Sequence, residues 1–146
     1  MLTRAALTSE ITTDPAGIGY GPFLNVNDQK VADLINQVRP SITVFRNDLR
    51  GSEVFGAIVL AEYALLTPAN QSFINTMILT PTIDVTSSTI RSNIVAIFGA
   101  GTATRANLGG IAQRTGSRAE QLGGTGTVVS ELDVANALGR FNAGQG

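Results

Sequence analysis

Helix-start signals recur along this chain of 146 residues, and they constrain its fold more than any other feature. At each signal, a residue whose side chain can cap a helix stands directly before a stretch with apolar residues at helical spacing. The capping positions are Thr3, Asn27 or Asp28, Ser52, Thr67 before Pro68, Ser87 or Ser88, Thr102, Ser117 and Ser130. They predict a mainly α fold, a compact bundle of about seven helices with short loops. At this length the chain is expected to form one helical domain over residues 1–146.

The apolar stripes and the prolines set the expected bounds of these helices. Apolar residues at the spacing of one helix face run through residues 31–38, and Pro40 is expected to end that helix. The next helix is expected over residues 53–66. Residues 42–45 and 81–86 are the place where one short extended pair is expected.

The segment 94–101, IVAIFGAG, allows two interpretations. It could be a strand that runs into a dinucleotide-binding turn, but that motif needs a third glycine where this chain has Thr104, and a larger sheet around it. Apolar residues at positions 90, 94, 97 and 98 instead share a face at a period of 3.6, and Gly99 stands where a helix commonly stops. We therefore expect a helix over 88–98. A small nucleotide-binding enzyme built on the turn Gly99-Ala100-Gly101 is the less favoured alternative.

The composition removes most catalytic chemistry. The chain has no histidine and no cysteine, so it lacks the commonest general base, the usual zinc ligands and any disulfide. It has no P-loop and no calcium-binding loop. Glu131 and Asp133 fit the first turn of a helix, and Asp28 and Asp33 do not share a helix face well, so nothing favours paired-carboxylate catalysis over solvated charges. We expect no enzymatic activity, no cofactor, no bound metal and no small-molecule substrate.

The charge balance and the apolar runs bear on partners and location. Ten basic and eleven acidic residues nearly cancel and form no polybasic run, so no nucleic-acid partner is expected. No apolar run approaches the length of a membrane span, and the first residues do not read as a signal peptide. Synthesis in the cytoplasm and no membrane association are expected. Hydrophobic residues make up 43% of the chain and charged residues 14%, which favours self-association or a protein partner.

Three arginines form a loose basic cluster after the second expected helix. Arg39, Arg46 and Arg50 could line a solvated loop, or they could contact an acidic surface of a partner, because arginine is enriched in interfaces. Both interpretations stay open at the level of the sequence, and the three residues are candidate interface residues.

The loop DPAGIGYGPF, residues 14–23, supplies two further candidate interface residues. Its glycines and prolines exclude regular structure, but its large apolar side chains are unsuited to a solvated linker, so an ordered loop packed by its own side chains is expected. Tyr20 and Phe23 can pack on the core of the same chain or dock into a neighbouring subunit.

Several segments resemble, in their order along the chain, a family of small proteins encoded by tailed bacteriophages and prophages. They are DPAGIGY at 14–20, SEVFGAI at 52–58, LT at 66–67, IFG at 97–99 with Thr104, SRAE at 117–120 and VV at 128–129. The resemblance covers most of the chain, although residues 122–124 are richer in glycine than the family pattern.

The resemblance implies a viral structural protein without known enzymatic activity. It would lie in the virion, at the head–tail junction, in the tail or on the capsid, after synthesis in the cytoplasm of the bacterial host. Its expected partners are other virion proteins and further copies of itself in a homo-oligomer. The alternative within the same class is an assembly factor that leaves before the particle matures.

Overall fold

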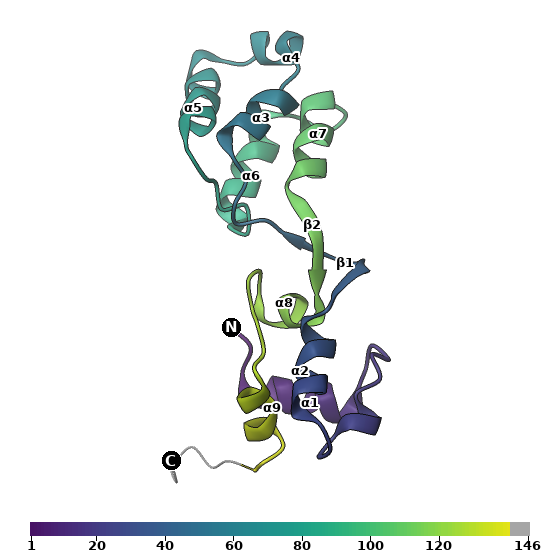
Figure 1. The fold of residues 1–146 in the computed structure, drawn as a ribbon. Helices are drawn as coiled ribbons and strands as arrows, with labels where there is room; N and C mark the ends of the chain where they lie inside the picture. The colour runs from purple at the N-terminus through teal and green to yellow at the C-terminus, as the bar shows by residue number, and fades with distance from the viewer. Residues whose placement is uncertain (141–146) are drawn as a thin grey trace. The chain divides into compact units, whose positions relative to one another are not determined.

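The computed structural model describes residues 1–140, and these residues form two compact units. Unit 1 combines residues 1–44 with the chain from Thr115 onward, whereas unit 2 is the continuous segment 45–114. Within the described range there are nine α-helices, one short 3-10 helix and a two-stranded sheet (Figure 1). The predicted mainly α fold with one short extended pair is confirmed. A single domain over residues 1–146 stays a prediction.

Unit 1 is built from both ends of the chain. Its elements are α1 (Arg4–Thr13), the 3-10 helix η1 (Gly21–Phe23), α2 (Asp28–Asn36), α8 (Arg118–Gly123) and α9 (Glu131–Ala137). Helix α2 packs on α8 and α9, and α1 packs on α9. The buried residues of this core are Leu7, Ile11, Tyr20, Val31, Ala32, Ile35, Ala119, Val129, Val134 and Ala137. The predicted caps Thr3, Asn27, Ser117 and Ser130 each accept a hydrogen bond from a backbone N–H in the first turn of their helix.

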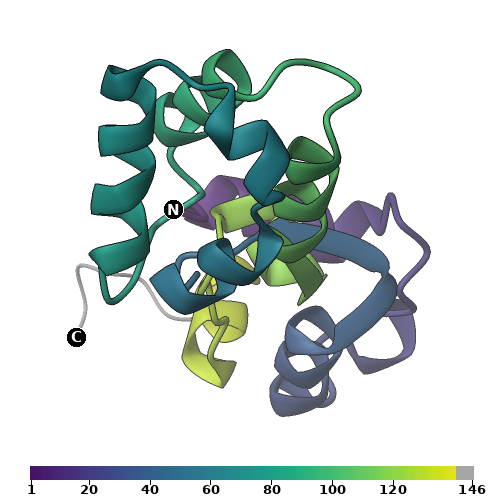
Figure 2. The same cartoon turned by 90° about the horizontal axis from the view of Figure 1, so that it is seen from above.

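Unit 2 has a separate hydrophobic core. Its helices are α3 (Gly51–Ala57), α4 (Leu60–Ala64), α5 (Pro68–Leu79), α6 (Ser88–Ile97) and α7 (Ala103–Ile111). Helix α3 packs against both α5 and α7 and lies between them in Figures 1 and 2. The core consists of Leu49, Val54, Ala57, Ile74, Met77, Ile83, Val85, Phe98 and Leu108. The expected helix over 88–98 is therefore present, with Ser87 as its cap and Phe98 buried at its end.

The two strands are β1 (Val38–Phe45) and β2 (Gln113–Ser117), and they pair with each other. The prediction that residues 81–86 pair with this strand is wrong. That segment instead forms an isolated bridge, outside the sheet, between Ile83 and Leu49. The strands run in opposite directions, because the Arg46 N–H donates to the Ala112 carbonyl at 2.9 Å while Gly116 lies against Val44. A Cβ at Gly116 would come within 2.9 Å of the Val44 side chain, so glycine permits this close approach.

Two expected helices have different bounds. Helix α2 ends at Asn36, and the sequence from Val38 through Pro40 continues as strand β1 instead of helix. The helix expected over 53–66 is divided into α3 and α4, because the Val59 N–H leaves the helical pattern and donates to the Thr104 hydroxyl at 2.9 Å.

The start of α3 also differs from expectation. It begins at Gly51, one residue before the predicted cap Ser52. The space there suits glycine alone, since a Cβ would overlap the backbone carbonyl of Ile78.

Candidate functional site

The loop that follows α1 is held by one carboxylate. Asp14 ends α1 with a positive φ of 44°, and its carboxylate accepts hydrogen bonds from the backbone N–H groups of Ile18 at 2.7 Å and Gly19 at 2.8 Å. Gly17 and Gly19 have φ angles of 66° and 97°, which glycine adopts without steric cost. The loop is therefore ordered, as the sequence predicts, and it turns Tyr20 toward the core.

Tyr20 is fully buried and belongs to a polar network inside unit 1. Its hydroxyl donates to the Glu10 carboxylate at 3.2 Å, and Arg118 donates to both oxygens of the same carboxylate at 2.8 and 2.9 Å. Burial, followed by the charge of Glu10, raises the pKa of Tyr20 far above its ordinary value, so the hydroxyl stays protonated. Because no part of its side chain is exposed, Tyr20 has no surface to offer a partner, and its place among the candidate interface residues is wrong.

Phe23 and Arg39 also lie in unit 1, and both are partly committed to it. Phe23 is half-buried against the core, and the ammonium group of Lys30 lies 5.9 Å from the centre of its ring. Arg39 donates to the carbonyl of Leu34 at 3.0 Å, while its buried Nε has no hydrogen-bond partner. These contacts leave one side of Phe23 exposed and tie Arg39 to the end of α2.

Arg46 and Arg50 belong to unit 2, so the three arginines are divided between the units. Arg46 donates to both oxygens of Glu53 at 2.9 and 3.0 Å, to Asp48 at 3.0 Å and to the Ile111 carbonyl at 3.1 Å. The hydrogen bonds from Arg46 lower the pKa of Glu53 and raise that of Arg46. Arg46 is thus an internal ion-pair residue, whereas Arg50 is exposed and can contact a partner.

The turn Gly99-Ala100-Gly101 connects α6 to α7, and its surroundings argue against a phosphate site. The Glu62 carboxylate accepts hydrogen bonds from the backbone N–H groups of Ala103 at 2.8 Å and Thr104 at 2.7 Å. These amides open α7 and are the ones that a dinucleotide phosphate would need. Hydrogen bonding from Thr104 lowers the pKa of Glu62, so the carboxylate remains charged and occupies the helix terminus.

Four large apolar side chains in or beside three helices of unit 2 are exposed, and sequence reasoning missed them. They lie in or beside α3, α4 and α5 and are Phe55, Leu60, Leu65 and Leu79. Each exposes more than two thirds of its side chain, from 69% for Phe55 to 86% for Leu65. The helical periodicity could not identify them, because the apolar residues of these segments exceed what one buried face can hold.

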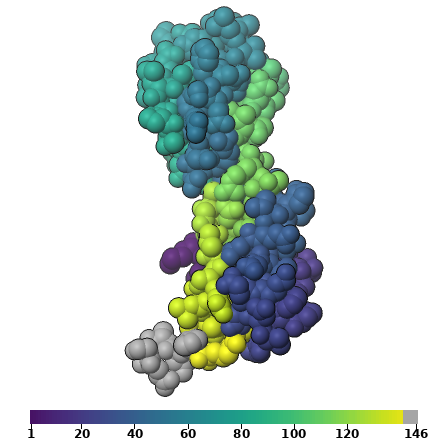
Figure 3. Space-filling model, in the orientation of Figure 1, coloured from purple at the N-terminus to yellow at the C-terminus, as the bar shows by residue number. Residues whose placement is uncertain are grey.

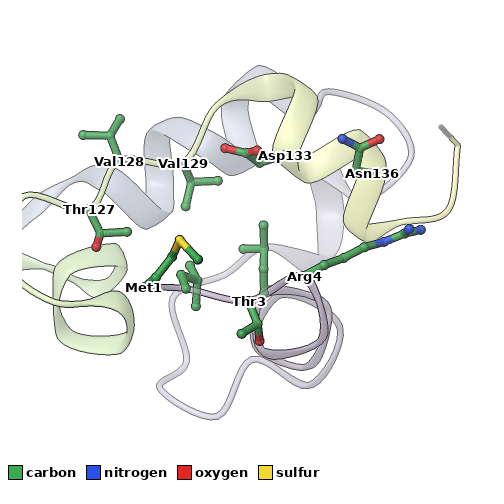
Figure 4. A pocket seen from close by; sticks show the side chains of 10 residues that line it. Met1, Thr3, Arg4, Thr127, Val128, Val129, Asp133 and Asn136 are labelled. Atoms are coloured by element: carbon green, nitrogen blue, oxygen red, sulfur yellow. The ribbon is translucent and has the colours of Figure 1, made fainter. Parts of the chain in front are cut away.

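A groove of about 400 Å³ lies in unit 1 between the first residues and α9. Figure 4 shows Met1 to Arg4 forming one wall and the segment from Thr127 to Asn136 forming the other. In the space-filling view the purple N-terminal end projects beside the yellow-green chain (Figure 3). The groove mixes apolar side chains with polar ones, and Arg4 and Asp133 are its charged lining residues.

Within residues 1–140, no group of three or more histidine, cysteine, aspartate or glutamate side chains could hold one metal ion, and no helix has the length and apolarity to cross a membrane. No protein-family model, no curated protein and no solved structure matches this chain.

Proposed function

We propose that this chain is a non-enzymatic structural protein of a tailed bacteriophage virion, at the head–tail junction, in the tail or on the capsid surface. It would act through protein–protein contacts repeated by symmetry. The support comes from the ordered segments that resemble the phage family and from the part that these segments play in the fold.

One observation carries the proposal: side chains from two of the segments that resemble the phage family bind the carboxylate of Glu10. DPAGIGY contributes Tyr20 and SRAE contributes Arg118, and both side chains bind the same buried carboxylate although Arg118 is 108 residues away from it. The resemblance therefore rests on residues that act together in one folded unit. Their roles are structural, as expected where a family retains a scaffold without an active site.

The arrangement of charges favours a scaffold over an enzyme. The carboxylates of Glu10, Glu53 and Glu62 are each engaged with an arginine or a helix N-terminus of the same chain. The exposed apolar side chains on α3 to α5 provide surface that association with another protein can bury.

Quantitative mass spectrometry of purified particles tests the proposal. Particles from the host that carries this gene should contain the chain at a fixed copy number that matches a ring or a shell. Presence in immature particles together with absence from mature ones supports the assembly-factor alternative. Absence from both overturns the proposal.

Two variants, measured in the same particle assay, test whether the exposed apolar side chains make the contact. Leu65→Asp places a charge on an exposed apolar side chain, whereas Ala69→Asp places it on a small exposed residue in the first turn of α5. Reduced incorporation of Leu65→Asp with normal incorporation of Ala69→Asp is expected if the apolar surface contacts another virion protein.

A further inference from the structure

Unit 2 contains an apolar hollow of about 200 Å³ beside α6 and α7. Its walls are formed mainly by Phe45, Leu49, Val85, Ile94, Leu108 and Ala112. Pockets for cofactors and drug-sized ligands usually measure roughly 300–1,000 Å³. The size and lining of this hollow therefore suit one or two apolar side chains of a protein.

Two arginines at the edge of the hollow give that edge a positive charge. Arg91 is fixed in place, because it donates to the carbonyls of Val85 at 2.8 Å and Thr86 at 2.7 Å and stacks over the ring of Phe45. Arg105 also lines the hollow, and its guanidinium has no hydrogen bond or ion pair with any residue in the range 1–140. An occupant with an apolar side chain for the hollow and a carboxylate for the arginines would therefore be complementary to this site.

The chain itself carries such a segment at the start of α9. Every one of its eleven acidic residues lies in the described range, and ten of them have a hydrogen bond or an ion pair there; the exception is Glu131. Glu131 is exposed, and its neighbour Leu132 exposes 56% of its side chain. Val128, three residues before Glu131, is 75% exposed. This combination of free carboxylate and exposed apolar side chains is complementary to the hollow.

We infer that residues 128–132 of a second copy of this chain dock into the hollow of unit 2. Leu132 enters the apolar space, and Glu131 pairs with Arg105. The two surfaces are different, so the contact is head-to-tail, and it generates a closed ring or an open filament. The inference rests on the proposed function in one respect, that the chain acts through protein contacts.

The chain offers a matched pair of variants for the hollow itself. Gly109 lines the hollow and its Cβ position is open space, so Gly109→Leu should fill the hollow without disturbing the helix. Gly110 is the next residue of α7, also has open space at its Cβ position, and does not line the hollow. Sedimentation velocity of the full chain, from micromolar to millimolar concentration, should show self-association in the native protein and in Gly110→Leu. In Gly109→Leu it should be at least about tenfold weaker.

A charge exchange tests the identity of the occupant. Arg105→Glu and Glu131→Arg should each weaken self-association about tenfold or more, because each places like charges together. The double variant with both changes should recover most of the native affinity. Recovery in the double variant distinguishes a restored ion pair from damage to α9 caused by a cation at its N-terminus.

Three results would overturn the inference. The first is a native chain that stays monomeric at every concentration. The second is association that Gly109→Leu does not change, since the contact then lies elsewhere, for example on α3 to α5. The third is association that is blocked by Gly109→Leu but indifferent to the charge at residue 131, because another occupant then fills the hollow. Absence of the chain from particles overturns the proposed function and leaves this contact standing, so the two failures are distinguishable.

Discussion

The two units of this protein both have apolar cores, and they differ in the polar contacts that accompany those cores. In unit 1, polar contacts join the ends of the chain: Arg118 with Glu10, and Asn36 with both the N–H and the C=O of Val129, 93 residues away. Unit 2 is one continuous segment, and its core is almost entirely apolar, with Glu62 and Arg46 at the ends of its helices.

This difference has a consequence for folding. All residues of the unit 2 core lie within 70 consecutive residues, 45–114, so its core contacts span shorter sequence separations than those that join the two ends of the chain in unit 1. The core of unit 1 cannot form until α8 and α9 reach it from the other end of the chain. Contacts of such high sequence separation cost more chain entropy to form. The side chains of Arg118 and Asn36 help to join these distant segments, so loss of either is expected to weaken unit 1.

Each unit contains one of the two tyrosines, which gives a separate signal for each. Tyr20 is in the core of unit 1, and Tyr63 packs against the core of unit 2 with its hydroxyl donating to Asn75 at 2.8 Å. Fluorine NMR of a chain labelled with 3-fluorotyrosine can follow unfolding of both units in one sample.

The largest expected effect follows from Arg118→Met. The variant leaves the buried Glu10 carboxylate without its cation, and breaking a pair in this way costs about 3–5 kcal/mol. The Tyr20 signal should report unfolding at a lower urea concentration, while the Tyr63 signal keeps its midpoint. The control is Arg4→Met at an exposed arginine of α1, which should shift neither signal. Equal shifts of both signals would show that the units unfold as one domain.

Gly51→Ala should produce the corresponding effect in unit 2. The added Cβ overlaps the backbone of Ile78, which cannot yield as a side chain can, and overpacking of this kind costs about 3 kcal/mol. The Tyr63 signal should lose its native position at a lower urea concentration. Gly56→Ala in the same helix is the matched control, because the Cβ there meets open space and alanine favours the helix by about 0.5–1 kcal/mol. A Gly51→Ala chain as stable as the native one would contradict the close approach of α3 to α5.

Asn36→Ala should weaken unit 1 by a smaller amount. The side chain of Asn36 donates to the Val129 carbonyl at 2.7 Å and accepts from its N–H at 2.9 Å, and leaving these buried groups unpaired costs about 1–3 kcal/mol. Urea titration of the Tyr20 signal measures the loss. Ser9→Ala on the exposed side of α1, in the same unit, provides the control and should change the free energy of unfolding little. A result indistinguishable from that control would mean that Asn36 does not join α2 to the segment before α9.

Acidification should act on unit 2 through Glu53 and Glu62. The pKa of both carboxyl groups is lowered in the folded chain relative to the ordinary value of 4.5. A group of this kind stabilises the fold above its unfolded pKa and loses that contribution as the pH falls through its folded pKa. The urea midpoint of the Tyr63 signal should therefore decrease below about pH 4.5. In Glu62→Gln it should depend less on pH in the same range; an unchanged pH dependence would contradict a charged Glu62 at the start of α7.

Local features of the sequence predicted the helices well. Thr3, Thr67, Ser87, Thr102 and Ser117 all cap helices at the expected positions, because a capping residue acts on amides only three residues away. The buried Tyr20 and the ordered loop around it also agree with one of the two interpretations that the sequence allowed.

The features that the sequence did not predict depend on contacts between residues far apart in the chain. The division between α3 and α4 depends on Thr104, 45 residues after Val59, and no glycine or proline marks it at that point. Strand β2 has the sequence QRTGS, without the alternation of apolar residues that indicates a strand, so its pairing with β1 could not be predicted. The sequence places Arg46 among the candidate interface residues, because it does not specify the turn across which Arg46 meets Glu53. The arginine contacts depend on the fold, and no local pattern distinguishes a free arginine from a paired one.

The hydrogen bond between Arg46 and Ala112 has a consequence for how the gene can change by recombination. It places the entry and the exit of unit 2 side by side, next to the ends of two strands that run in opposite directions. An in-frame deletion of the codons between them would leave ends that a two-residue hairpin turn can join. Loss, exchange or duplication of the whole segment could therefore occur in a single recombination step without interrupting the core of unit 1. Homologues with a shortened or foreign central segment between intact DPAGIGY and SRAE segments would be the record of such events.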